Sequence, residues 1–119
     1  MKLSELYSRL NGDFADACSR LLSEKMVARF VVKFPEDPSM QNLRDAVAAG
    51  DIETSFRSAH TLKGVSGILA FTALYKAAWD LTEQLRPRQS QADPELLAEV
   101  EKEYGKTVAA LKEYSENPE

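Results

Sequence analysis

The sequence predicts an all-α protein, an antiparallel four-helix bundle with additional short helices at its N-terminal end. Apolar residues recur every three or four positions through almost all of the 119 residues, and no segment shows the strict alternation of a half-buried strand. The connections between these segments are short, which is typical of helices that pack against their sequence neighbours. We therefore expect one helical domain over 1–119, with a four-helix core at about 39–114 and N-terminal helices at about 2–34 packed on it.

The N-terminal part is expected to contain two or three short helices. The first covers 3–10 and stops at an Asn-Gly pair, a common helix C-terminus. The stretch 13–34 has the same periodicity and stops before two prolines, which interrupt helices. Ser23 followed by Glu24 is also a helix start signal, so this stretch is either two helices or one kinked helix.

Four longer helices are expected in the core, each with start or stop signals. Their expected bounds are 39–49, 51–69, from a corner at 70–72 to just before Pro87, and 93–114. Ser39 is expected to cap the first helix and Gly50 to end it. Asp93 followed by Pro94 is a strong start for the fourth, because the two residues suit the N-cap and the first helical position.

Composition and charge exclude several functional classes. The net charge is −4 and no basic stripe interleaved with aromatic residues appears, so nucleic-acid binding is not expected. The single cysteine, Cys18, cannot form an internal disulfide, and no cysteine–histidine pair is available for zinc. The apolar stretches are too short for a signal peptide or a membrane span. We expect a cytoplasmic domain with no membrane segment and no metal, and a monomer, because nothing in the sequence demands a dimer.

The only histidine, His60, lies near the middle of the helix expected at 51–69. At about 100° per residue it falls at the edge of the apolar face, close to Gly64 and to Lys63. Glycine inside a helix costs about 1 kcal/mol relative to alanine, which indicates a packing or functional reason. A nucleophilic ring, an adjacent gap and a nearby cation suit transient phosphoryl transfer. The alternative is an ordinary histidine at the surface or core edge, and periodicity alone does not exclude it.

The next helix carries a second row of residues beside its core positions. The row consists of Tyr75, Trp79, Thr82 and Arg86. An antiparallel hairpin about the corner at 70–72 places residues 81–82 level with His60. The aromatic pair either packs under the N-terminal helices or forms the shoulder of a docking surface, where tryptophan and tyrosine are favoured anchors.

The run Ala-His-Thr-Leu-Lys-Gly at 59–64 resembles the signature of the histidine-containing phosphotransfer (HPt) domain family, the intermediate carriers of phosphorelays. The similarity extends to the Gly-Asp pair at 50–51 and to the leucine spacing after the run, so it covers most of the chain. The resemblance implies that His60 accepts a phosphoryl group from the aspartyl phosphate of a receiver domain and hands it to another receiver. It also implies that Lys63 is the charge partner of that group and that Gly64 leaves room for the receiver.

Two positions depart from the pattern of the family that the chain resembles. The family often has glycine where this chain has Ala70, which affects the geometry of the corner. It often has an acid or glutamine level with the histidine where this chain has Thr82, which affects the hydrogen bond that orients the imidazole. Neither departure removes the reacting group.

The remaining chemistry is expected to come from a partner. No carboxylate cluster surrounds His60 to hold magnesium, and no phosphate-binding glycine loop is present, so an ATP-dependent kinase or other enzyme is not expected. Receiver domains that bring their own Mg²⁺ are the expected partners, with a hybrid sensor kinase as a further candidate. The expected docking residues are Phe56, Arg57, Gly67, Trp79 and Thr82. The competing hypothesis is a helical interaction module that binds a signalling partner and never carries phosphate.

Overall fold

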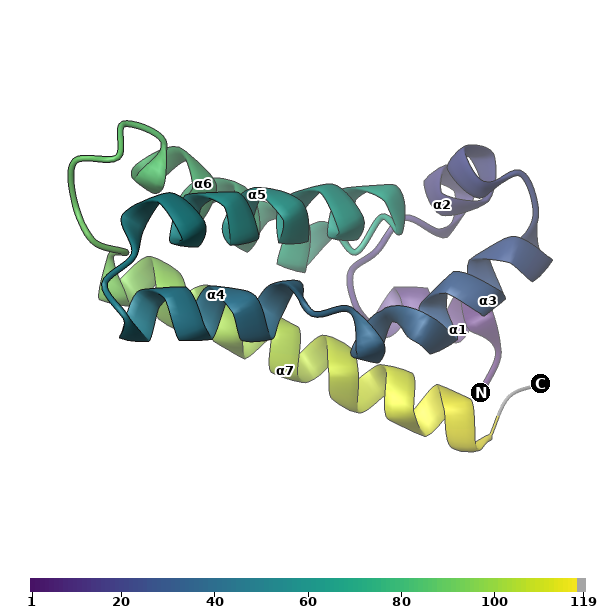
Figure 1. The fold of residues 1–119 in the computed structure, drawn as a ribbon. Helices are drawn as coiled ribbons and strands as arrows, with labels where there is room; N and C mark the ends of the chain where they lie inside the picture. The colour runs from purple at the N-terminus through teal and green to yellow at the C-terminus, as the bar shows by residue number, and fades with distance from the viewer. Residues whose placement is uncertain (118–119) are drawn as a thin grey trace.

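The computed structural model describes residues 1–117, which form seven α-helices and one short 3-10 helix (Figure 1). No strand occurs among these residues, and the predicted all-α fold is confirmed. The elements are α1 (Leu3–Arg9), α2 (Phe14–Leu21), α3 (Glu24–Lys33), η1 (Phe34–Glu36), α4 (Ser39–Ala48), α5 (Ile52–Ile68), α6 (Thr72–Leu85) and α7 (Pro94–Glu116).

The helices are arranged in two groups along one long axis. Helices α4, α5, α6 and the first half of α7 form an antiparallel bundle at one end (Figure 1). At the other end α1 and α3 contact α7, and α2 lies against α3 and the end of α5. The described chain measures 46 × 25 × 20 Å. Its buried hydrophobic side chains form one cluster, which extends from Leu6 in α1 to Tyr114 in α7. The N-terminal helices therefore lengthen the bundle and share its core.

The stretch 13–34 contains two helices. Leu22, between them, has a φ of +75°, a left-handed conformation that cannot continue a right-handed helix. Ser23 then caps α3, because its hydroxyl oxygen accepts a hydrogen bond from the N–H of Met26 at 3.2 Å. The Ser-Glu pair is thus a true helix start, which decides between the two alternatives that the sequence left open.

The start of α4 differs from the prediction by one residue. Ser39 is not the cap but the first residue of the helix, and it is buried. The carboxylate of Asp37 accepts the hydrogen bond from the Ser39 N–H at 2.9 Å, so an acid two residues earlier satisfies this helix end. At the other end Gly50 stops the helix as predicted, with a φ of +69°.

Helix α5 ends with the same two backbone hydrogen bonds as α4, but Ala70 stands where α4 has Gly50. The N–H of Ala70 donates to the carbonyl of Gly67 at 3.1 Å, and that of Phe71 donates to Ser66 at 2.9 Å. This pattern places Ala70 in the left-handed region, with a φ of +54°. A side chain there is strained by roughly 1–2 kcal/mol. The departure at residue 70 therefore changes the stability of the corner and leaves its geometry intact.

The N-terminal helices hold this corner from outside. The buried hydroxyl of Tyr7 donates to the carbonyl of Leu69 at 2.7 Å, and the N–H of Asp13 donates to the carbonyl of Ala70 at 3.0 Å. Burial raises the pKa of Tyr7, so the phenol keeps the proton that it donates. Two carbonyls at the end of α5 are thus satisfied by residues more than fifty positions earlier in the chain.

Candidate functional site

Helix α5 presents the candidate residues from a fixed frame. Its N-cap, Asp51, accepts a hydrogen bond from the N–H of Thr54 at 3.0 Å, and hydrogen bonds from Thr54 lower the pKa of Asp51. Ala59 and Leu62 are at most 1% exposed and fix the inner face of the helix in the core. His60 therefore lies outside, where its ring is exposed to solvent.

The imidazole of His60 lies against an aromatic ring. It is stacked on Phe56, one turn earlier, with ring centroids 5.9 Å apart and planes inclined by 18°. The guanidinium of Arg88 covers Phe56, with its Cζ atom 3.6 Å from the ring centroid. The guanidinium of Arg86 also lies over this ring, at 5.3 Å, and Phe56 is only 8% exposed. Little of its surface is left for a partner, and its role in docking stays a prediction.

Thr82 is absent from the surface around His60. It is completely buried, and its hydroxyl donates to the carbonyl of Ala78 at 2.6 Å. Threonine can enter a core in this way because the backbone of its own helix satisfies the hydroxyl. The prediction of Thr82 as a docking residue is therefore wrong. Among residues 1–117 the imidazole has no hydrogen-bond partner at position 82 or elsewhere.

Lys63 lies one turn after His60, but its charge is directed to the neighbouring helix. Its Nζ atom is 4.7 Å from the ring centroid of Trp79, a cation–π contact. Trp79 is 43% exposed, as a docking residue must be, and it also contacts Tyr75 with ring centroids 6.0 Å apart. Trp79 and Tyr75 thus form a ridge on α6, which Lys63 contacts from α5 one turn after His60.

The two glycines after His60 have different surroundings. A Cβ atom on Gly64 would meet nothing within 4 Å, so this position opens directly to solvent. A Cβ atom on Gly67 would lie 2.9 Å and 3.0 Å from two ring carbons of Tyr75. Gly67 is therefore needed for packing inside the protein, and its role toward a partner stays a prediction. Tyr75 packs against Gly67 of α5, an arrangement outside the two alternatives stated for the aromatic pair, and Trp79 remains accessible.

Glu83, which was not among the residues predicted for the site, interacts electrostatically with His60. Hydrogen bonds from Arg86, at 2.9 to 3.2 Å, are the main reason that the pKa of Glu83 is lowered. The positive charges of Lys63 and of a protonated His60 act in the same direction. Glu83 could have been predicted from the sequence, because it directly follows Thr82, which the register of the hairpin places level with His60.

Arginines on two elements share one carboxylate at the start of α5. Arg57, an expected docking residue with a side chain 73% exposed, pairs with Glu53 at 3.0 Å. Arg88, from the loop after α6, pairs with the other oxygen of Glu53 at 2.9 Å. Both arginines lower the pKa of Glu53, with the Arg88 hydrogen bond as the largest cause. Arg88 was missed because nothing in a loop sequence indicates which helix it returns to.

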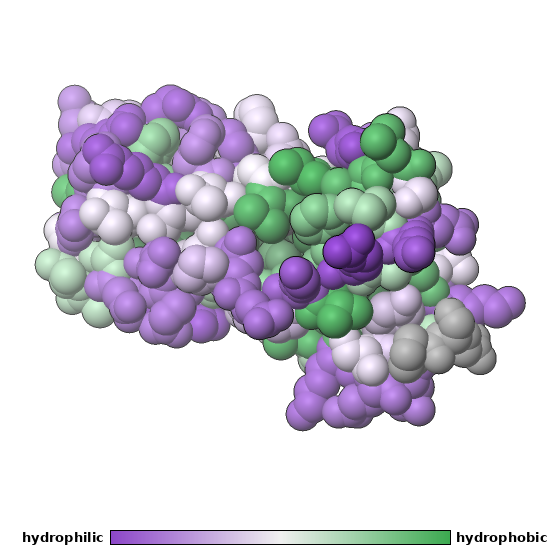
Figure 2. Space-filling model, turned by 45° about the vertical axis from the view of Figure 1, so that its right-hand side comes forward, coloured by the Kyte–Doolittle hydropathy of each residue, from purple (hydrophilic) through white to green (hydrophobic). Residues whose placement is uncertain are grey.

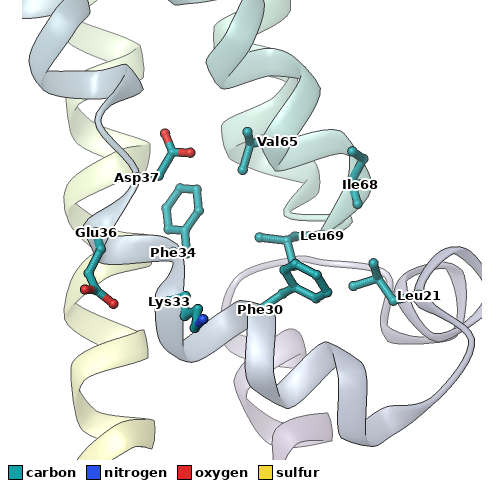
Figure 3. A pocket seen from close by; sticks show the side chains of 9 residues that line it. All are labelled: Leu21, Phe30, Lys33, Phe34, Glu36, Asp37, Val65, Ile68 and Leu69. Carbon is teal, nitrogen blue, oxygen red and sulfur yellow. The ribbon is translucent and has the colours of Figure 1, made fainter.

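Two hollows lie beyond His60, toward the N-terminal helices. One is an apolar groove of about 650 Å³ between the end of α5 and the helices α2 and α3 (Figure 3). Its lining includes Leu21, Phe30 and Ile68, and hydrophobic side chains gather on this face of the molecule (Figure 2). The other hollow, of about 380 Å³, includes Lys63 and Gly64 in its lining and shares Ile68 with the groove. The imidazole itself lines neither of them.

Within residues 1–117, no group of three or more histidine, cysteine, aspartate or glutamate side chains is placed to hold a metal ion. In the same part of the chain, no helix has both the length and the apolar character needed to cross a membrane.

Comparison with known proteins identifies one match. The sequence model of the Hpt domain family matches residues 25–113, which extend from the start of α3 almost to the end of α7. No curated protein and no solved structure matches the chain. The matched segment contains His60, Lys63, Gly64 and the ridge on α6, whereas α1 and α2 lie outside it.

Proposed function

The chain belongs to the Hpt domain family, whose members transfer phosphoryl groups through a histidine in phosphorelays, and we propose that its phosphoacceptor is His60. His60 takes the phosphoryl group from the aspartyl phosphate of one receiver domain and passes it to a second. The observation that carries the proposal is the position of the only histidine: it is exposed on α5, with open space at Gly64 one turn later.

The transfer is an exchange of bonds at phosphorus. An unprotonated ring nitrogen of His60 attacks, an N–P bond forms, and the O–P bond of the aspartyl phosphate breaks to return a carboxylate to the receiver. The reverse exchange loads the next receiver. The transition state is loose and catalysis depends on positioning and charge stabilisation, so the domain needs to supply little beyond the nucleophile. We assign the Mg²⁺ and its acidic pocket to the receiver.

Lys63 is the cation that the domain contributes. Its ammonium leaves the ring of Trp79 and pairs with the phosphoryl group when His60 is loaded. A cation–π contact at an exposed site stabilises by about 0.5–1 kcal/mol, less than a charge-assisted hydrogen bond to a phosphoryl oxygen. The contact with Trp79 therefore holds the side chain ready at little cost to transfer.

Hpt domains interact with receiver domains and kinases of phosphorelays. For this chain we propose that the receiver docks over the exposed side of α5 and the ridge of α6. Arg57 and Lys63 offer positive charge to the acidic site of a receiver, and Trp79 is the exposed aromatic anchor. We propose that the domain acts as a monomer, with a hybrid sensor kinase as one source of the phosphorylated receiver.

A second function, a helical interaction module that never carries phosphate, is favoured by one observation. No hydrogen bond orients the imidazole within residues 1–117, because the residue level with it, Thr82, is buried. Such a module would bind its partner equally well after His60→Ala.

Phosphorylation of the purified domain decides between the two. The domain is mixed with several pre-phosphorylated receivers, with His60→Gln alongside, and assayed for acid-labile, base-stable phosphate. Phosphoramidate, a small chemical donor that needs no docking surface, is used in parallel. Phosphate on the wild type alone supports the carrier. Labelling of His60 by phosphoramidate but by no receiver supports the interaction module.

A further inference from the structure

We infer that Arg88, in the loop between α6 and α7, is a positioning residue that holds the His60 imidazole through the ring of Phe56. This inference rests on the proposed function of His60. Arg88 does not act on phosphorus itself. It clamps the surface on which the nucleophile lies, and so restricts the orientations of the imidazole.

The three groups are arranged in sequence. The imidazole of His60 is nearly parallel to the ring of Phe56, at the 5.9 Å centroid separation of an offset stack. The Arg88 guanidinium lies on the same phenyl ring, 3.6 Å from its centroid. A second guanidinium, that of Arg86, lies farther from the same ring, with its Cζ atom 5.3 Å from the centroid. The Phe56 ring is therefore held mainly by Arg88 and contacted by the imidazole, which leaves it little freedom to turn.

Arg88 is itself fixed by two directed hydrogen bonds. Its Nε donates to the Glu53 carboxylate at 2.9 Å, and its Nη1 donates to the carbonyl of Arg86 at 2.8 Å. Glu53 belongs to α5, three residues before Phe56, so the loop is tied to the histidine helix across 35 sequence positions. The backbone of Arg88 has a φ of +55°, an uncommon conformation for this residue that the tertiary contacts sustain.

The imidazole needs such a restraint because the residue level with it, Thr82, does not hydrogen-bond to it. The buried hydroxyl of Thr82 donates to its own helix, so it cannot orient the imidazole. An exposed ring without a hydrogen bond exchanges between several rotamers. Misplacement of a nucleophile by about 1 Å can cost about 100-fold in rate. Stacking on a fixed phenyl ring restricts those torsions while both ring nitrogens stay available.

The planar guanidinium is suited to this task, and a lysine is not. Arginine can lie flat on an aromatic face and donate in two fixed directions at once, whereas an ammonium is a single point of charge. The inference therefore predicts that Arg88→Lys fails to replace Arg88 although it preserves the charge. A purely electrostatic role would be rescued by that change.

The test measures orientation and transfer separately. NMR of the unphosphorylated domain records the ring-proton shifts of His60 and its cross-relaxation with Phe56. In Arg88→Ala and Arg88→Lys the contact with Phe56 should weaken and the His60 shifts should move toward those of an unstacked histidine. Arg57→Ala, which removes an arginine from the same carboxylate without touching Phe56, should leave both signals in place.

Transfer from a saturating phosphorylated receiver should then slow by about 3- to 10-fold in both Arg88 variants, with the KM for the receiver unchanged. Arg44→Ala is the control, because Arg44 also combines a glutamate pair with an aromatic contact, to Glu101 and Tyr104. These contacts are made between α4 and α7, so the rate should not change.

A substitution of Phe56 tests the stacked ring directly, because the Arg88 variants also remove the ion pair with Glu53. Phe56→Leu retains an apolar side chain but removes the ring, and it should slow transfer as much as Arg88→Ala. The double variant should be no slower than either single one, because both changes remove the same restraint. Additive losses, rescue by Arg88→Lys, or unchanged NMR signals in Arg88→Ala would overturn the inference. A wild type that no receiver phosphorylates would instead overturn the proposed function, and the positioning role with it.

Discussion

Replacing Gly64 with glutamine should stabilise the isolated domain. An ideal Cβ atom at this position meets nothing within 4 Å, so the new side chain enters open solvent without displacing a neighbour. Glycine inside a helix is about 0.5–1 kcal/mol less favourable than a good helix former such as glutamine. For a domain of this size that gain corresponds to a rise in Tm of about 3–6 °C, measurable by circular dichroism.

The same change should block exchange with receivers. The side chain projects from the helix one turn after His60, into the space through which a receiver must bring its aspartyl phosphate to the ring. Transfer requires close approach of the reacting atoms, so we expect a loss of at least about 100-fold in the rate from a phosphorylated receiver. Phosphoramidate needs no such approach surface, and its labelling of His60 should stay within about twofold of the wild-type rate.

The chain contains its own control for this experiment. Gly105, inside α7, is also a helical glycine with nothing within 4 Å of an ideal Cβ. Gly105→Gln should raise the Tm by a similar amount and leave receiver transfer unchanged. Normal receiver transfer in a folded Gly64→Gln domain would refute the steric reasoning. Loss of phosphoramidate labelling as well would show that the glutamine disturbs His60 directly.

Three further predictions concern charge and backbone strain. Lys63→Ala should slow receiver transfer by about 5- to 30-fold without abolishing it, because the metal of the partner carries most of the neutralisation; complete loss in stopped-flow assays, with binding intact, would assign Lys63 the larger share. Ala70→Gly should stabilise the domain by about 1 kcal/mol by relieving the left-handed strain, and an unchanged or lower midpoint of urea unfolding would contradict this. Hydrogen bonds from Arg86 lower the pKa of Glu83 in the folded state. This carboxylate therefore stabilises the fold above its unfolded pKa of about 4.3, and the contribution is lost as pH falls through the folded value. Glu83→Gln should lower the Tm at pH 7 and have no effect near pH 2, and equal Tm changes at the two pH values would contradict the assignment.

Helix ends could be predicted from the sequence where a residue with a strong preference for helix boundaries stands alone, such as glycine after a helix. Gly50 stops α4 and Asp51 caps α5 because a left-handed residue and an acceptor side chain are each needed at a helix boundary. Ser39 was misplaced because its neighbourhood offers two suitable acceptors. The sequence does not show that Asp37 accepts a hydrogen bond from the N–H of Ser39, which makes Ser39 the first helical residue and not the cap.

Side-chain exposure on α6 was harder to predict than the helix itself. Thr82 and Trp79 belong to the same row, yet one is completely buried and the other is 43% exposed. A small rotation of the helix decides between them, and a threonine that bonds its own backbone is accepted in the core. The contact of Arg88 with Phe56 was beyond prediction, because it depends on how a loop folds back on a helix 32 positions earlier, from residue 88 to residue 56.

The two hydrogen bonds from the N-terminal part to the corner after α5 determine how truncation of the N-terminus would affect the domain. A fragment that starts at residue 25 would keep the whole segment that matches the Hpt family, together with every residue proposed for transfer. It would lose the Tyr7 hydroxyl and the Asp13 N–H, which donate to the carbonyls of Leu69 and Ala70. The carbonyls at the end of the histidine helix would then bond to water instead, and the apolar surface covered by α1 and α2 would be exposed. We therefore expect a fragment of residues 25–117 to unfold at a lower temperature than the chain with α1 and α2.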